Sequence, residues 1–173
     1  MNQTLISLKE RRSVRSFKEE QIAENLLDAV LEAGTYAPTG MNRQSPLMVV
    51  VQNKDTLETL RRMNAAILGN PDADPFYGAP TVIIVFADKN VRTYREDGSL
   101  VIGNLCNAAH AVGLGSCWIH RAREEFETEE GKALMKEWGI DECYEGIGHC
   151  ILGYTAVTPE VKPRKDGYII KIK

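Results

Sequence analysis

Short runs of apolar, β-branched residues most constrain how this chain can fold. Residues 47–51 (LMVVV) and 82–86 (VIIVF) are apolar throughout, which is typical of strands buried on both faces. Residues 116–119, 147–154 and 168–172 predict three further extended segments. Because buried strands need other elements packed over them, the sequence predicts a sheet with helices packed on it.

Apolar residues at helical spacing predict those helices. Within residues 21–37, Ile22, Leu26, Val30 and Ala33 recur at steps of three and four residues and would line one face of a helix. The other predicted helices are residues 3–11, a segment that begins at the capping pair Asp55 and Glu58, residues 99–112 and residues 128–138. No G-x-G-x-x-G lies between a strand and a helix, and G-x-x-x-x-G-K is absent from the sequence. A regular nucleotide-binding, doubly wound sheet is therefore not supported.

Composition and charge narrow the class of protein. The 173 residues, 43% of them hydrophobic, fit a single domain over residues 1–173. A net charge of −3 gives no general attraction to nucleic acids or membranes. No apolar run approaches the roughly 20 residues of a membrane span, and the N-terminus lacks the pattern of an export signal, so we expect a cytoplasmic protein.

The chain has four cysteines: Cys106, Cys117, Cys143 and Cys150. They show no C-x-x-C pair and no metal-ligand spacing with the histidines, which predicts free thiols and no metal.

Two clusters of basic residues lie near the two ends of this acidic chain. The first contains Lys9, Arg11, Arg12, Arg15 and Lys18, and the second contains Lys162, Arg164, Lys165, Lys171 and Lys173. Together they could form a divided anion site, because Arg matches the geometry of a phosphate and Ser13 would add a donor. The alternative is a solvated basic surface, which is the commoner meaning of a single charge run.

Two loop segments offer groups for a polar, planar ligand. Residues 38–44 (PTGMNRQ) stop a helix and supply backbone N–H groups, a hydroxyl and side-chain amides. In residues 113–120 (GLGSCWIH), glycines permit close approach, and Trp118 with Ile119 forms an apolar wall where an isoalloxazine ring could lie. The alternatives are an ordinary helix stop and a Trp118 that belongs to the core. His120 could donate a proton or be structural.

In their order along the chain, these segments resemble the nitroreductase family of FMN-dependent oxidoreductases. The resemblance is carried by RRSVRSF at 11–17, APTGMNRQ at 37–44, FYGAP at 76–80, GLGSCWI at 113–119, LGY at 152–154 and KPR at 162–164. It spans nearly the whole chain. It implies an α+β fold with a central mixed, mainly antiparallel sheet flanked by helices, and a homodimer in which the C-terminal arm, residues 155–173, is exchanged.

The resemblance also implies a bound FMN held by both basic clusters. Arg11 would contact the phosphate and the ribityl chain, with Ser13 nearby, and Lys162 and Arg164 would close over the phosphate. Arg15 would lie at the N1–O2 edge of the flavin, where negative charge gathers on reduction. The complete predicted cofactor-binding set is Arg11, Arg12, Ser13, Arg15, Pro38, Thr39, Gly40, Asn42, Gln44, Asn64, Trp118, Ile119, Lys162 and Arg164. No catalytic side chain is expected, because the flavin itself performs hydride chemistry.

Some implied contacts depend on a second subunit. The loop at residues 38–44 would reach the flavin of the partner. Asn64 would reach the pyrimidine edge of the ring. Residues 155–167 read as a Pro-rich, basic connector, and residues 168–170 would pair as a strand with a sheet edge of the partner.

The chain departs from the family pattern at two places near the expected site. Many members have Trp directly after the Gln of the loop motif, where this chain has Ser45. Many have Gly after the Trp-Ile pair, where this chain has His120 followed by Arg121. Both departures bear on the shape of the site and therefore on the choice of substrate.

The resulting hypothesis is an NAD(P)H-dependent oxidoreductase that passes electrons through FMN to nitroaromatics, quinones or similar small electrophiles by a ping-pong mechanism. The alternatives within the flavin family are reductive dehalogenation and flavin breakdown. A non-enzymatic flavin-binding redox module is an alternative from another class. A nucleic-acid binder is disfavoured by the acidic pI of 5.7 and by the absence of a recognition motif.

Overall fold

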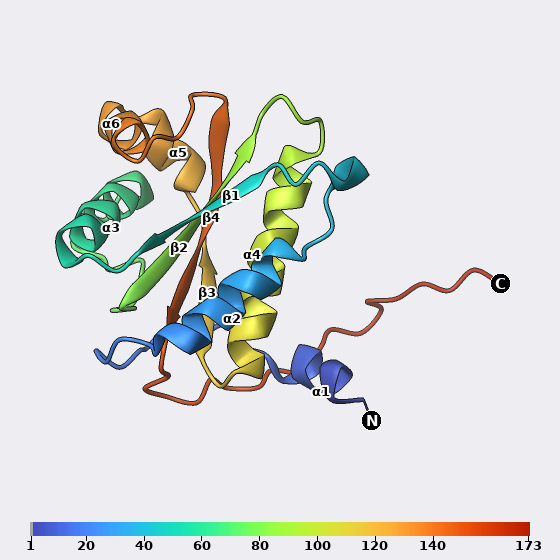
Figure 1. Cartoon of the computed structure of the whole chain (residues 1–173). Coiled ribbons are helices and arrows are strands. Elements are labelled where there is room, and N and C mark those ends of the chain that lie inside the picture. Colours follow the sequence, from blue (N-terminus) through green and yellow to red (C-terminus); the bar gives the residue numbers. More distant parts are fainter. Residues whose placement is uncertain (1) are drawn as a thin grey trace.

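The computed structural model describes residues 2–173 and contains one four-stranded sheet (Figure 1). The strands are β1 (Pro46–Val51), β2 (Thr81–Asp88), β3 (Gly115–Ile119) and β4 (Tyr144–Gly153). Their order is β1-β2-β4-β3, and all three pairings are antiparallel. The prediction of a mainly antiparallel α+β fold is confirmed. The expected parallel component is reduced, within residues 2–173, to a single bridge between Ser13 and Ser116.

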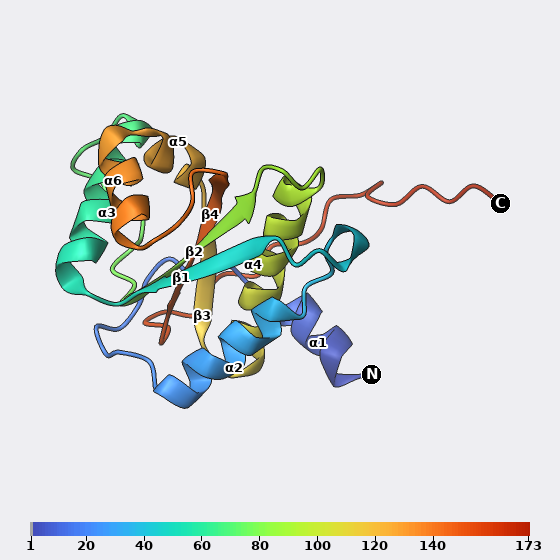
Figure 2. The same ribbon diagram turned by 45° about the horizontal axis from the view of Figure 1, so that its top comes forward.

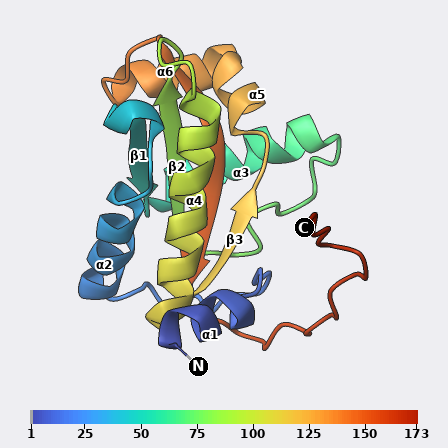
Figure 3. The same ribbon diagram turned by 90° about the vertical axis from the view of Figure 1, so that its right-hand side faces the viewer.

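Helices cover both faces of the sheet and enclose a separate core on each. One face carries α2 (Glu24–Thr35) and α4 (Tyr94–Ala111), and the other carries α3 (Lys54–Leu68), α5 (Ala122–Glu127) and α6 (Glu129–Glu137). Figure 3 shows α4 crossing the middle of the sheet. Alternate residues of β2 serve the two cores: Ile83 and Val85 pack under α4, while Ile84 and Phe86 face the α3 side. This explains why β2 is an unbroken apolar run.

Several element boundaries differ from those expected, for local reasons. The helix α3 begins at Lys54 because Asn53 caps it, accepting a hydrogen bond from the backbone N–H of Thr56 at 3.0 Å, so the predicted Asp55–Glu58 capping pair is wrong. The short helix α5 was not predicted. The expected strand at residues 168–172 is not formed within this chain, where those residues are exposed.

The first residues of the chain run along the outer edge of β3. The helix α1 (Gln3–Glu10) is followed by an extended segment in which the Val14 N–H donates to the Ser116 carbonyl at 2.9 Å. Further along, the Lys18 N–H donates to the Tyr154 carbonyl at 2.9 Å, and the Ala156 N–H donates to the Ser16 carbonyl at 3.0 Å. These bonds place the N-terminal basic cluster beside the start of the C-terminal arm, residues 155–173, which then leaves the body of the molecule (Figures 1 and 2).

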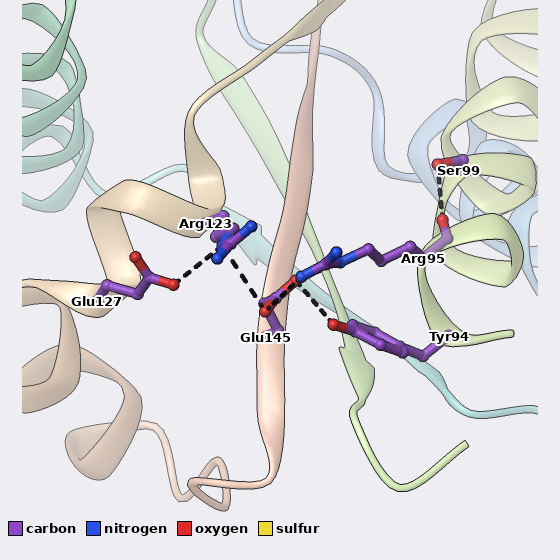
Figure 4. A network of polar contacts seen from close by, with 6 residues as sticks. All are labelled: Tyr94, Arg95, Ser99, Arg123, Glu127 and Glu145. Atoms are coloured by element: carbon purple, nitrogen blue, oxygen red, sulfur yellow. Dashed lines mark hydrogen bonds and ion pairs between the residues drawn. The ribbon is translucent and has the colours of Figure 1, made fainter. Parts of the chain in front are cut away.

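A polar network ties α4, α5 and β4 together at the other end of the sheet (Figure 4). The carboxylate of Glu145 accepts hydrogen bonds from Arg95 Nε at 2.9 Å and from the Tyr94 hydroxyl at 3.2 Å, and Arg123 Nε lies 3.8 Å from it. Burial raises the pKa of Glu145, but the hydrogen bond and positive charge of Arg95 outweigh it and leave the pKa below its usual value. Each charged group here has a partner within the chain.

The described residues contain no helix that is long and apolar enough to cross a bilayer. Within residues 2–173 there is also no cluster of three His, Cys, Asp or Glu side chains that could hold a metal ion.

Candidate functional site

A pocket of about 470 Å³ lies between the N-terminal segment and the C-terminal arm. Arg12, Ser13 and Arg15 line it from one side, and Lys162 and Arg164 line it from the other. Val157, Pro159 and Glu160 complete the lining. The structure therefore brings together residues of both basic clusters, which are separated by almost the full length of the sequence.

The N-terminal wall of this pocket is held by the sheet. Val14 is buried, so Ser13 and Arg15 on either side of it point the other way, as alternate residues of an extended segment do. The side chain of Arg12 is held by the backbone of preceding residues, since its Nη1 donates to the carbonyls of Lys9 at 2.6 Å and of Arg11 at 2.8 Å. The packing of Val14 thus decides which side chains face the pocket.

The cations around the pocket have no carboxylate partners. Within residues 2–173, no ion pair involves Arg11, Arg15, Lys162 or Arg164. Glu160 is the one acidic residue in the lining. Several Arg and Lys groups with a hydroxyl beside them form a donor set that fits a phosphate, and in the described part of the chain none of these cations forms an ion pair.

The positive charges of Arg11 and Arg15 affect the pKa values of nearby cysteine thiols. Burial raises the pKa of Cys117, whereas a hydrogen bond with Ser13 and the charges of Arg15 and Arg11 act in the opposite direction. The hydrogen bond with Cys150 lowers the pKa of Cys106 to about 7, and Arg11 acts in the same direction. Arg11 is not among the residues that line the pocket, but its charge acts on Cys117 as that of Arg15 does, and on Cys106 as well. As predicted, all four cysteines are free.

The loop at residues 38–44 lies far from this pocket. It contains the short 3₁₀ helix η1 (Gly40–Asn42), and the Gly40 N–H donates to Asp97 at the start of α4 at 2.9 Å. The Gln44 N–H donates to the Thr39 hydroxyl at 3.0 Å. Figures 1 and 2 show this loop beside the first turns of α4 and the N-terminal segment beside its last turns. One copy of the chain therefore does not assemble all the predicted residues.

The distance between these two parts follows from α4. Eighteen residues of helix extend over about 27 Å. Met41, Asn42 and Gln44 have positive φ angles, and all three are exposed, so the loop presents its polar groups outward. The buried hydroxyl of Ser45 has no hydrogen-bond partner within residues 2–173. Pro38, which precedes the loop, is exposed as well.

The edge strand β3 connects the pocket with a second polar region. Ser116, near its start, pairs with Ser13, and Ile119 ends the strand. Trp118 is 37% exposed, so it is not simply a core residue, whereas Ile119 is buried. His120 is exposed directly after the strand.

Asn64 is fully buried, and its amide is occupied within the chain. Its Nδ2 donates to the His120 carbonyl at 2.9 Å and also to Glu125, and its Oδ1 accepts from Arg121 Nε at 2.9 Å. A direct contact with the flavin would require this side chain to move. The contact between Asn64 and the flavin is still a prediction. Both the nitrogen and the oxygen of the Asn64 amide already have hydrogen-bond partners within the chain.

Two buried polar residues of this region were not singled out from the sequence. Glu125 of α5 and His149 of β4 have no exposed surface, and His149 Nε2 lies 3.0 Å from Glu125 Oε2. A histidine inside an otherwise apolar strand was the signal that could have identified His149. Glu125 carried no such signal, because its helix was not predicted.

A second cleft, of about 990 Å³, lies between α5, α6 and β4 and contains none of the predicted residues. Its cation Arg123 pairs with Glu127 at 3.0 Å, and its cation Lys132 pairs with Glu129 at 3.0 Å. Its lining also contains Lys89 and Lys136, but the carboxylates of Asp141, Glu142 and Glu145 lie in the same cleft. Cations and anions are therefore mixed in the larger cleft, unlike in the smaller basic pocket.

The whole folded body matches known proteins. A family model described as the nitroreductase family matches residues 8–154. A protein of Methanothermobacter thermautotrophicus with the provisional name NADH dehydrogenase/NAD(P)H nitroreductase is 30% identical over 171 residues, which cover 94% of this chain and 82% of that protein. An FMN reductase [NAD(P)H] of Bacillus subtilis is 28% identical over 71% of this chain and 56% of its own length.

Solved structures agree over the full length, including the arm. A nitroreductase with bound FMN from Bacteroides fragilis superposes with a TM-score of 0.91 at 30% identity, with 100% of both chains covered. A nitroreductase with bound FMN from Desulfitobacterium hafniense gives 0.90 at 27% identity, again with 100% of both chains covered.

Proposed function

The chain belongs to the nitroreductase family, and from this premise we propose that it binds FMN and passes electrons from NAD(P)H through the flavin to small electrophiles. The observation that carries the proposal is the pocket in which Ser13 and two unpaired cations of the arm face each other. The FMN in two similar solved structures supports the identity of the cofactor.

The pocket is the proposed seat of the FMN phosphate. Ser13, Lys162 and Arg164 would donate hydrogen bonds to its oxygens, with Arg12 fixed beside them, and Arg11 would hold the ribityl side. The flavin, once bound, supplies the hydride chemistry. Arg15 would place a positive charge where the reduced ring becomes negative, which favours two-electron reduction.

The rest of the site would come from a second copy of the chain. The loop with Thr39, Gly40, Asn42 and Gln44 lies at the start of α4, and the N-terminal segment lies at the other end of this helix, which is about 27 Å long. We therefore do not expect one FMN to touch both in the same copy. A dimer in which α4 helices pack side by side in opposite directions would bring the loop of one copy to the pocket of the other.

Exposed apolar side chains support this dimer. Leu5 and Leu8 of α1 and Leu100 of α4 are about half exposed. Along the arm, Tyr168, Ile169, Ile170 and Ile172 are 74–91% exposed, which is unusual for an apolar, β-branched run. We propose that the arm wraps the partner and that residues 168–172 pair with an edge of its sheet.

The proposed acceptors are nitroaromatics, quinones and similar flat electrophiles. Nicotinamide and acceptor would stack in turn on one exposed face of the flavin beside Trp118. Steady-state rates at several acceptor concentrations, with NADH and with NADPH, test this arrangement. Parallel double-reciprocal lines are expected, because each substrate must leave before the next binds. Intersecting lines would show that both bind together, and no turnover with either nicotinamide would remove the oxidoreductase assignment.

A further inference from the structure

A buried acid–imidazole pair lies behind the end of β3. Glu125 Oε2 and His149 Nε2 are 3.0 Å apart, and neither side chain has any exposed surface. The second ring nitrogen of His149, Nδ1, lies 3.3 Å from the carbonyl oxygen of Ile119. The second oxygen of Glu125 accepts a hydrogen bond from Asn64.

The hydrogen-bond partners of His149 and Glu125 indicate which of their atoms carry protons. A carbonyl oxygen can only accept, so Nδ1 of His149 carries a hydrogen and donates it to Ile119. One further proton lies between His149 and Glu125, on either the ring or the carboxyl group. With that proton the pair is neutral overall and every one of its polar atoms is bonded, which is what burial requires.

The hydrogen bonds of this network fix the three successive carbonyl groups of residues 119–121, where β3 ends. His149 binds the carbonyl of Ile119, Asn64 binds that of His120 at 2.9 Å, and the Glu125 N–H binds that of Arg121 at 2.9 Å. Arg121 has a φ of 79°, a left-handed conformation that favours glycine. Its Nε donates to Asn64 Oδ1 at 2.9 Å, so its own side chain helps to fix this backbone conformation.

The amide N–H groups of this turn point the opposite way. In a trans peptide the C=O and the N–H lie on opposite sides, and the described residues contain no cis peptide. Because the Ile119 and His120 carbonyls face the buried network, the N–H groups of His120 and Arg121 face away from it. Within residues 2–173 neither N–H has a hydrogen-bond acceptor.

The helix that carries Glu125 sits tightly on the sheet. A Cβ at Gly146 of β4 would lie 2.6 Å from the carbonyl oxygen of Ala122, so the chain admits no side chain between α5 and β4. Ala122 and Phe126 are buried in the same contact. The turn is therefore held against a rigid base as well as by hydrogen bonds.

We propose that Glu125, His149 and Asn64 are positioning residues for the flavin: from the buried side they hold residues 119–121 so that the amide N–H groups of His120 and Arg121 meet the electron-rich edge of the ring. The inference rests on the proposed FMN function. The turn lies at the far end of β3 from Ser116, about 10 Å along the strand from the phosphate pocket, which suits the ring end of FMN. Fixed N–H dipoles stabilise negative charge that develops on reduction. Asn64 would then act on the flavin through the turn.

The test measures the reduction potential and the FMN content of variants of the full chain. Glu125→Leu removes the acceptor of both His149 and Asn64, and we expect the equilibrium constant for flavin reduction to fall at least tenfold, about 30 mV for a two-electron couple. Glu125→Gln should keep the potential near that of the wild type. Its carbonyl can accept from Asn64 and its amide can donate to a neutral His149. FMN content should be retained in both, since the phosphate pocket is untouched.

A matched structural control is Phe126→Leu, which weakens the neighbouring contact with Phe86, at 4.7 Å between ring centres, but leaves the turn intact. It should lower the melting temperature without moving the potential. If Glu125→Leu does not fold, Asn64→Ala decides the question, because it frees the His120 carbonyl while leaving the Glu125–His149 pair. An unchanged potential in the folded turn variants, or an equal shift in Phe126→Leu, would overturn the inference alone. A wild-type protein that binds no FMN would overturn the proposed function as well.

Discussion

The Glu145 network and the basic pocket contain the same types of cation, yet their surroundings are opposite. At the network, Arg95 and Arg123 share a carboxylate that is 11% exposed, and each contact ties one element to another. At the pocket, Arg15, Lys162 and Arg164 face one another without a carboxylate partner. An arginine that is neutralised by its own chain stabilises the fold, whereas a group of cations that the chain leaves unneutralised is suited to an external anion.

The same contrast in charge pairing distinguishes the two clefts as candidate anion sites. The larger cleft, about 990 Å³, mixes cations with several carboxylates, and the smaller one, about 470 Å³, contains four cations and one carboxylate, that of Glu160. The smaller cleft is the better match for a phosphate by charge, although the other is larger. If substituting cations of the two regions had the same effect on FMN binding and on folding stability, the contrast between the regions would be wrong.

The largest effect is expected from removing half of the pocket. Deleting residues 157–173 takes away Lys162 and Arg164 together with the exposed apolar end of the arm. We expect loss of both stable dimerisation and FMN, measured by light scattering and flavin content. A truncated chain that stays dimeric with one FMN per chain would show that the arm binds neither the phosphate nor the partner.

Arg11→Ala should weaken FMN binding by about 1.5–3 kcal/mol, the range for a hydrogen bond to a charged group. Fluorescence titration of flavin-free protein measures this change. Arg62→Ala is the matched control, because Arg62 is an exposed arginine already paired with Glu130. Equal affinities of the two variants would mean that an unpaired arginine near the pocket has no special role.

Arg15→Ala should slow flavin reduction by about tenfold, a charge interaction of about 1.4 kcal/mol, while changing FMN affinity less. The physical reason is that its proposed partner is a charge that appears only on reduction. Stopped-flow reduction by NADPH, compared with equilibrium FMN binding, separates the two effects. A loss of affinity as large as the loss of rate would assign Arg15 to binding instead.

Glu145→Gln should cost about 1 kcal/mol of folding stability at neutral pH and leave FMN binding unchanged. The pKa of Glu145 in the folded protein lies below its usual value of 4.5, so its ion pairs stabilise the fold above that pH. This contribution is lost as the pH falls through the folded pKa. Urea unfolding between neutral pH and about pH 3 should show a weaker acid dependence in the variant than in the wild type. Reduced FMN affinity in the variant would contradict the division between the two regions.

The sequence predicted the parts of the fold that depend on local patterns. The run at residues 82–86 became the buried strand β2, and the helical spacing around Val30 became α2. Residues 47–51 did form a strand, but β1 lies at the edge of the sheet and only Val51 is buried in it, so the expectation of a fully buried strand there is wrong. The resemblance also placed Ser13 and Lys162 at one site, which the pocket now brings together. The predictions of strands and helices succeeded because periodicity remains visible in a single sequence. The binding of FMN by Ser13 and Lys162 is still a prediction.

What the sequence did not provide depends on contacts between distant residues. The Glu125–His149 pair joins α5 to β4, and nothing in either local sequence indicates the other partner. The strand expected at residues 168–172 is absent from the single chain because a strand needs a second edge, which this chain does not offer to its own arm. Intermolecular pairing of that segment is still a prediction.

The central claim is that the unpaired cations hold the phosphate of FMN, and a comparison of FMN with riboflavin tests it most directly. Flavin-free full-length protein would be titrated with each ligand by calorimetry, because the two differ only in the phosphate group. We predict one FMN per chain and riboflavin binding weaker by more than tenfold, since each lost hydrogen bond to a charged group is worth about 1.5–3 kcal/mol. Equal affinities for the two ligands, or no binding of FMN, would contradict the account.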